Sequence, residues 1–127
     1  MIIRREQKSA LAERQRRAQC DLARDYLRAE LRDLVADLGD DALFEHCRES
    51  MEIGLAFGLS DHRSVVWLAA MRVLIHPRFH EHPRLRALLA DPRVPPEARI
   101  DHVLAEATEL DFHEAAIVGP GIPLAEP

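Results

Sequence analysis

The chain has 127 residues, of which 47% are hydrophobic and 31% are charged, and its formal net charge is −5. This length suits one domain, which can bury enough surface to fold without a metal or a disulfide, and the hydrophobic fraction argues against disorder. The charge is unevenly distributed: residues 1–17 carry six Arg or Lys and two Glu, a net charge of +4, so residues 18–127 carry −9. A basic N-terminal arm therefore precedes an acidic body, which favours an acidic partner or attraction within the chain.

The cysteine content and the N-terminal residues indicate a compartment. Cys20 and Cys47 do not have the short spacing of a metal-binding motif. Two such thiols fit a protein of a reducing compartment, where Cys is often a small buried hydrophobe. The sequence is also compatible with a disulfide between them. The start, MIIRREQ, has no apolar core of signal-peptide length. No apolar run approaches the roughly 20 residues that span a membrane. We therefore expect a cytoplasmic protein with no membrane partner.

A long first helix is predicted from Arg4 to Leu38, because this stretch lacks Gly and Pro and is rich in good helix formers. Its second half has apolar residues spaced three and four apart, which form one helix face: Cys20, Ala23, Leu27, Leu31, Leu34 and Leu38. A straight helix of this length would measure about 50 Å, whereas a compact domain of this size has a radius of gyration of roughly 14 Å. Either the helix bends, or residues 1–17 project as an arm. The arm is then a solvated, frayed end or a surface that binds a partner.

A second helix follows Gly39, which breaks the first one. Asp40 or Asp41 is expected to cap its N-terminus. Its predicted buried stripe, with Phe44 alongside, consists of Leu43, Cys47, Met51 and Leu55. Gly58 is well placed to end this helix in a left-handed conformation, and the short link after it makes the next helix a neighbour.

The centre of the domain is predicted to be the stretch Ser60–Ile75. Ser60 is a good N-cap, and only Arg72 is charged among the last eleven residues of the stretch. A helix that is apolar on nearly all faces is normally buried. His76-Pro77 ends it, and Phe79 is expected to turn inward and anchor the following loop.

Two further helices are predicted, one over residues 84–90 and one that begins at Pro96-Glu97. The inner face of the second consists of Ile100, Val103, Leu104, Ala107 and Leu110. The pattern weakens from Asp111, and residues 119–127 are typical of a flexible or docking tail. No strand pattern is convincing. The predicted fold is therefore all-α: a single compact helical domain of four to five helices over residues 1–118, with a long N-terminal helix.

Residues that could carry chemistry are few. His76, His80 and His82 lie close in sequence and could bind Zn, Ni or Cu, but no Cys is near and the spacing matches no strong zinc motif, so a polar loop is favoured. His46 and Cys47 are adjacent on a predicted helix and point about 100° apart, unlike a nucleophile and its base. There is no Gly-rich phosphate loop. We therefore expect neither an enzyme nor a cofactor.

Nucleic-acid binding is also disfavoured. The basic residues of the arm could contact phosphates, but the arm has no aromatic residue to stack on bases, and the body is acidic. No predicted helix has the basic, polar face of a recognition helix.

Three blocks of the sequence carry a resemblance. The first is the opening, with Ile2, Ile3, Arg4 and Gln7. The second is GLAFGLSDHRSVVWLAAMRVLIHPRF, with a helix stop at Phe57-Gly58 and Phe79 after the apolar helix, and the third is PPEARIDHVLAEA, with Arg99, Ile100 and Asp101. Together they resemble, over about residues 1–110, a bacterial family of short helical proteins encoded beside type VI secretion effectors and spike proteins.

The chain departs from the family at the loop after the central helix. The family often has a Gly before this loop and acidic residues around the Phe, where this chain has His76, His80 and His82. It also has Leu85-Arg86-Ala87 in place of a Leu-Pro-Trp segment. The resemblance carries over no catalytic residue. It implies an adaptor or co-chaperone that helps load a toxin onto the secretion spike by binding an effector, its chaperone or a spike component.

The surface expected to bind this partner comprises Ile2, Ile3, Arg4 and Gln7, together with Phe79 and the histidine loop. An apolar head on a basic, overlong helix has little to bury against in its own domain, and a partner groove would cover it. One alternative is an immunity protein whose acidic body occludes a basic toxin. A further alternative is a small metal-binding protein built on the three loop histidines. Homo-oligomerisation through the first helix is compatible with all three.

Overall fold

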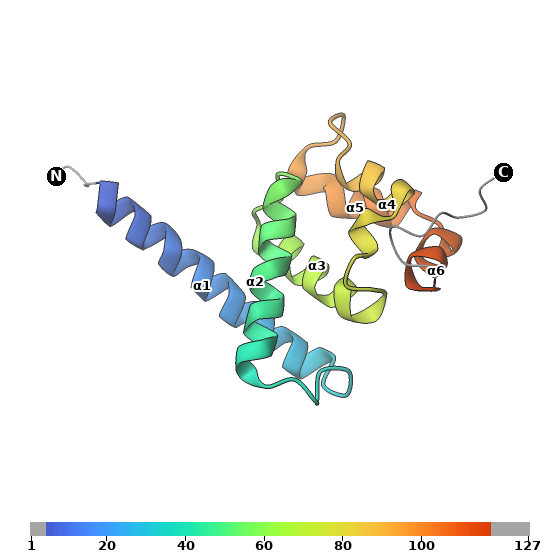
Figure 1. Ribbon diagram of the computed structural model, residues 1–127. Coiled ribbons are helices and arrows are strands. Elements are labelled where there is room, and N and C mark those ends of the chain that lie inside the picture. The colour runs from blue at the N-terminus through green and yellow to red at the C-terminus, as the bar shows by residue number, and fades with distance from the viewer. Residues whose placement is uncertain (1–4, 118–127) are drawn as a thin grey trace.

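The computed structural model describes residues 5–117, with side chains described from residue 8, and helices are the only regular secondary structure in this range (Figure 1). The all-α prediction is confirmed. The predicted number of four to five helices is too low, because six α-helices lie in this range. None of them is long and apolar enough to cross a membrane. The predicted tail, residues 119–127, lies outside the described residues.

The helices form two groups that meet at one shared helix. In chain order they are α1 (Arg5–Glu30), α2 (Asp40–Ala56), α3 (His62–Leu74), α4 (Pro83–Leu89), α5 (Arg99–Glu106) and α6 (Glu109–Ile117), with short 3₁₀ helices η1 (Phe79–Glu81) and η2 (Pro96–Ala98). The second half of α1 packs against α2 and α3, while α4, α5 and α6 gather on the side of α3 away from α1 (Figure 1). The first half of α1 extends beyond the rest of the molecule (Figure 1).

The first helix ends at Glu30, eight residues before the predicted Leu38. The chain turns over residues 31–38, and the side chain of Arg28 spans this turn by donating to the carbonyl oxygens of Val35 and Leu38 at 3.2 and 2.8 Å. Val35 is fully buried, whereas Leu34 is 57% exposed. The three-and-four spacing that continued through Leu34 and Leu38 was therefore misleading: the bend buries Val35 and reverses the chain toward α2.

The caps of the next two helices differ from the predicted ones. Gly39, not Asp40 or Asp41, occupies the N-cap of α2, which has no side-chain cap. Asp61, not Ser60, caps α3, and its carboxylate accepts hydrogen bonds from the Ser64 backbone N–H and hydroxyl at 3.1 and 2.6 Å. Both Ser and Asp are good N-caps, so residue type alone could not separate these neighbours.

The C-terminus of α2 is closed as predicted, by Gly58 at φ +80°. The backbone N–H of Leu59 donates to the carbonyl of Gly54, and that of Gly58 donates to Leu55, at 2.8 and 3.0 Å. This is a Schellman motif, in which a left-handed residue lets the chain satisfy the last helical carbonyls. The motif turns the chain directly into α3, so α2 and α3 are neighbours, as the short link predicts.

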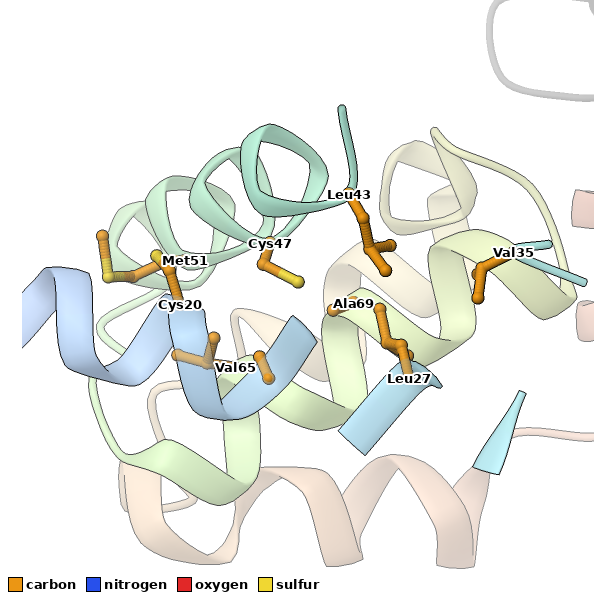
Figure 2. Packing of buried hydrophobic residues seen from close by; sticks show 9 residues of the cluster. Cys20, Leu27, Val35, Leu43, Cys47, Met51, Val65 and Ala69 are labelled. Atoms are coloured by element: carbon orange, nitrogen blue, oxygen red, sulfur yellow. The ribbon is translucent and has the colours of Figure 1, made fainter. Parts of the chain in front are cut away.

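Two hydrophobic cores lie on either side of α3. The first core is formed by α1, the 31–38 turn, α2 and α3 (Figure 2), and consists of Cys20, Ala23, Leu27, Val35, Leu43, Cys47, Met51, Val65 and Ala69. The second core joins α3 to the C-terminal helices and consists of Leu59, Leu68, Phe79, Leu85, Leu88, Leu89, Ile100, Val103 and Ala115. Leu55 was predicted to complete the α2 stripe but is 47% exposed.

The central helix is not buried on every face. Val65, Leu68 and Ala69 are fully buried, but Leu74 is 49% exposed. Arg72, its one late charge, is only 8% exposed. The helix therefore lies between two cores, with Val65 and Ala69 in the first and Leu68 in the second.

Candidate protein-binding surface

Phe79 does not lie on a surface. Its side chain is fully buried in the second core, and its ring centroid is 5.7 Å from that of Trp67. The expectation that Phe79 turns inward is confirmed, and its inclusion among the partner-binding residues is wrong, because a fully buried ring cannot contact a second protein. Ile2, Ile3 and Arg4 lie outside the described residues, and Gln7 is described only as part of the α1 backbone.

The first half of α1 projects without covering any core. From residue 8 to residue 18 the side chains are exposed, apart from half-buried Ala12, and the first buried residue of the helix is Cys20. Leu11 is 49% exposed and Leu22 is 56% exposed, although both are large apolar side chains on a rigid element. Water-exposed leucines in line on one helix face are typical of an interaction surface.

A groove runs beside these residues, between α1 and the start of α3. It has a volume of about 520 Å³. From α1 it is lined by Ala12, Gln15, Arg16, Ala18, Gln19 and Leu22, and its other wall is built by Met51, Leu55, Ser60 and His62. We call it the arm groove. Gln19 holds its two walls together, because its side-chain amide donates to the carbonyl of Ser60 at 3.1 Å.

A second hollow continues this surface along α1. It has a volume of about 390 Å³ and is lined by Tyr26, His62, Arg63, Val66, Trp67 and Ala70. His62 borders both hollows, so the apolar surface extends from Ala12 to Tyr26. Both hollows lie farther along the sequence than Ile2, Ile3, Arg4 and Gln7, the residues of α1 and its N-terminal side that were predicted to bind a partner. Leu22 could have been noticed as an apolar residue off the Cys20–Leu27 face of the helix.

The three loop histidines do not share one site. Nδ1 of His76 accepts a hydrogen bond from the Arg78 backbone N–H at 3.0 Å. The His80 ring is half-buried beside Phe57 and Phe79, and its buried Nδ1 has no hydrogen-bond partner. His82 is turned toward α6, where Nε2 lies 3.8 Å from Glu114. Within residues 5–117 the histidines therefore point to three different surroundings.

His82 instead meets two carboxylates that the sequence had left unassigned. The ligand atoms of His82, Asp111 and Glu114 lie within 4.8 Å of one another, which is close enough for one cation. Two of these side chains already cap helices, since Nδ1 of His82 accepts from the Leu85 N–H at 3.4 Å and Asp111 accepts from the Thr108 N–H at 2.9 Å. An Nδ1 that accepts leaves the proton on Nε2, where a metal would bind. The arrangement is a histidine–carboxylate contact that fixes α6 to α4.

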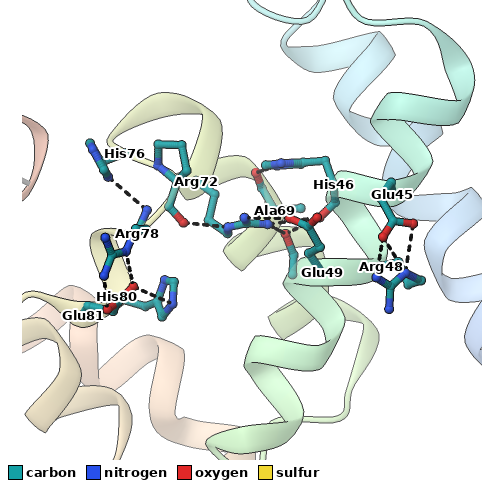
Figure 3. Close-up of polar contacts among 12 residues, drawn as sticks. Glu45, His46, Arg48, Glu49, Ala69, Arg72, His76, Arg78, His80 and Glu81 are labelled. Atoms are coloured by element: carbon teal, nitrogen blue, oxygen red, sulfur yellow. Dashed lines mark hydrogen bonds and ion pairs between the residues drawn. The ribbon is translucent and has the colours of Figure 1, made fainter. Parts of the chain in front are cut away.

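A polar cluster beneath the loop is organised by Arg72 (Figure 3). Its Nε donates to the carbonyl of Pro77 at 2.8 Å, and its Nη1 donates to the carbonyl of His46 and the hydroxyl of Ser50 at 3.2 and 2.9 Å. Its Nη2 lies 3.2 Å from Glu49. One guanidinium thus joins α2, α3 and the loop, and a buried charge must be bonded in this way.

The buried thiols are unsuited to nucleophilic chemistry. Cys20 and Cys47 are free and buried in the first core. Burial raises the pKa of the Cys47 thiol to about 12 and also raises that of Cys20. Because the thiolate is the nucleophile, both side chains act as apolar packing groups. His46 does not face Cys47, since its Nε2 lies 2.9 Å from the Ala69 carbonyl.

Acidification is expected to destabilise the fold through His46 and His80. Burial lowers the pKa of both rings below the usual value near 6.5, so the unfolded chain binds more protons than the folded one between the lowered pKa and about 6.5. The free energy of unfolding should therefore fall as pH drops below about 6.5, by no more than about 1.4 kcal/mol per pH unit for each histidine. Denaturant titrations at several pH values would measure this slope.

The matched variants for this measurement are His46→Gln and His80→Gln, which should each flatten the slope. His62→Gln is the control, because it removes an exposed histidine. An equal slope in all four proteins would show that other groups control the pH response.

Comparison of the chain with protein families, with curated proteins and with solved structures finds no match.

Proposed function

We propose that this chain is a non-enzymatic protein-binding adaptor or co-chaperone that contacts its partner through the projecting half of α1. The resemblance of the sequence to the family described above names the class of partner: a type VI secretion effector, its chaperone or a spike component. No catalytic residue is part of this proposal.

The observation that carries the proposal is the position of α1. An isolated helix shorter than about 12–15 residues is marginal in water, and most helices are held by packing of an apolar face. Leu11, in the first half of α1, is exposed with no buried residue of the helix beside it, and Leu22, in the second half, is exposed although Cys20 and Ala23 beside it are buried. A protein that packs on Leu11, Leu22 and the arm groove would supply the missing contacts, as a helix in a groove does.

An immunity role remains the second candidate because of the charge of the body. Residues 18–127 carry a net charge of −9, which would complement a basic toxin surface and speed its capture. The two roles differ in the activity of the bound toxin. An adaptor can leave the toxin active, whereas an immunity protein must abolish its activity.

Affinity capture from the native host, with identification of the bound proteins, tests the proposal. We expect the wild-type chain to retain an effector, its chaperone or a spike component, and Leu22→Glu to lose it. Leu104→Glu is the matched control, since Leu104 is a leucine of similar exposure (54%) on α5. Deletion of residues 1–9 should also reduce capture. Equal capture by all variants would contradict a role for α1, and inhibition of the captured toxin would favour immunity.

A further inference from the structure

We infer that a second copy of this chain packs antiparallel along α1 and covers the arm groove. The inference rests on the proposed role of α1 as the protein-binding element. Because the second copy would cover the same groove, an effector would have to displace it. It would make the adaptor a symmetric dimer, which is the commonest oligomer among soluble proteins.

The contact face is a narrow stripe of α1. Leu11, Gln15, Ala18 and Leu22 follow one another at spacings of four, three and four, so at about 100° per residue they fall within about 60° of one another on the helix. The buried residues Cys20 and Leu27 lie roughly opposite. The stripe therefore points away from the chain's own core, and its spacing is that of a seam between two helices.

The stripe is complementary to itself when two copies run antiparallel. With the two-fold axis between residues 16 and 17, Leu11 of one copy lies opposite Leu22 of the other, and Gln15 lies opposite Ala18. The small Ala18 lets the helices approach. Leu11 of the second copy then enters the arm groove beside Leu22, Met51 and Leu55, the large apolar side chains of its lining. Each leucine pair occurs twice, because the interface is the same patch on both subunits.

The charges beside the stripe select this direction. Arg14 and Asp21 lie on the same flank of α1, so the antiparallel register brings Arg14 of each copy near Asp21 of the other. In the single chain, Asp21 is 46% exposed and its nearest cation is Arg24, at 3.3 Å. In a parallel pair each flank would face the opposite flank of the other copy, so Arg14 of one copy would not lie near Asp21 of the other.

The test is the mass of the full chain in solution, measured by sedimentation equilibrium or light scattering over a wide concentration range. We expect twice the chain mass. Leu22→Glu should raise the dimer dissociation constant at least about 30-fold, as loss of a central anchor does, while the control Leu104→Glu should leave it unchanged. A monomer at every concentration, or a dimer unaffected by Leu22→Glu, would overturn the inference.

Charge exchange tests the direction of the pair. Arg14→Asp and Asp21→Arg should each weaken the dimer, and the double variant should recover it. If the double variant is weaker than both single variants, the helices do not pair in this register. Circular dichroism of every variant confirms that the chain still folds.

The outcomes separate this inference from the proposed function. If the wild type is a monomer that captures an effector, and the Leu22→Glu variant does not capture it, the adaptor role is supported and the second copy is contradicted. If the wild type is a dimer that Leu22→Glu weakens, but it captures no effector, the inference of a second copy is supported and the adaptor role is contradicted.

Discussion

Replacement of Phe79 by alanine is expected to lower the free energy of unfolding by about 3–4 kcal/mol, the usual cost of removing a fully buried aromatic ring. Phe79 has no exposed surface and stacks edge-on with Trp67 across the second core. It lies in the segment that leads from α3 to α4. The cavity would therefore open at the junction of α3 with the C-terminal helices.

Chemical denaturation followed by Trp67 fluorescence measures this loss directly, because the indole lies against the deleted ring. Leu110→Ala is the control: Leu110 is 63% exposed, so its truncation should change stability by less than about 0.5 kcal/mol. If Phe79→Ala instead kept full stability and lost only a partner, Phe79 would be a contact residue after all.

Replacement of Arg72 by alanine is the second large effect, with an expected loss of about 3 kcal/mol. Truncation removes four polar contacts and leaves the carbonyl of Pro77 without its guanidinium donor. The carbonyl of His46 still accepts from the Ser50 hydroxyl at 2.8 Å. It also leaves a void where the arginine stem had packed. Hydrogen bonds that involve a charged group are stronger than neutral ones. Arg72 should therefore contribute more to the free energy of unfolding than its ion pair with the exposed Glu49 alone would provide.

Thermal and urea unfolding of three variants would separate these terms. Arg72→Met keeps much of the stem and removes the donors, so we expect it to fall between wild type and Arg72→Ala. Arg78→Ala is the control: Arg78 pairs with Glu81 on the surface and its side chain is 57% exposed, and such pairs are worth at most about 1 kcal/mol. Equal stability of wild type and Arg72→Ala would mean that the guanidinium only offsets its own desolvation.

Helix periodicity predicted most of the fold. The stripe of Leu43, Cys47 and Met51 is buried, and Gly58 ends α2 in a left-handed conformation. These features depend on residues close together in sequence, so the spacing of those residues predicts which face of the helix is buried and where the helix ends. The end of α1 could not be found in the same way, because the stretch from Leu31 to Leu38 has good helical spacing and is bent by a tertiary contact, the reach of Arg28 over the turn.

The candidate binding surface was predicted only in outline. An overlong helix with a projecting first half is what the sequence indicates, and the exposed leucines agree with it. The arm groove could not be anticipated, since its walls come from α1, α2 and the start of α3. The contact of His82 with Asp111 and Glu114 depends equally on tertiary folding; only the three-residue spacing of the two carboxylates hinted that they share a helix face. Phe79 could not be assigned from the sequence, because an aromatic residue at this position can either anchor the loop in the core or contact a partner protein.

The position of α3 between two cores has a consequence for cooperativity. Val65 and Ala69 belong to the first core and Leu68 to the second, so opening either core removes support from the same helix. The amide protons of α3 should accordingly exchange with solvent only through opening of the whole domain, since the slowest exchange marks the global event. α6 is attached through the buried Ala115, the half-buried Phe112 and the contact with His82. α6 can therefore separate from the second core without unfolding of the rest of the domain. The chain thus combines a central helix, α3, that opens only with the whole domain and a C-terminal helix that opens locally.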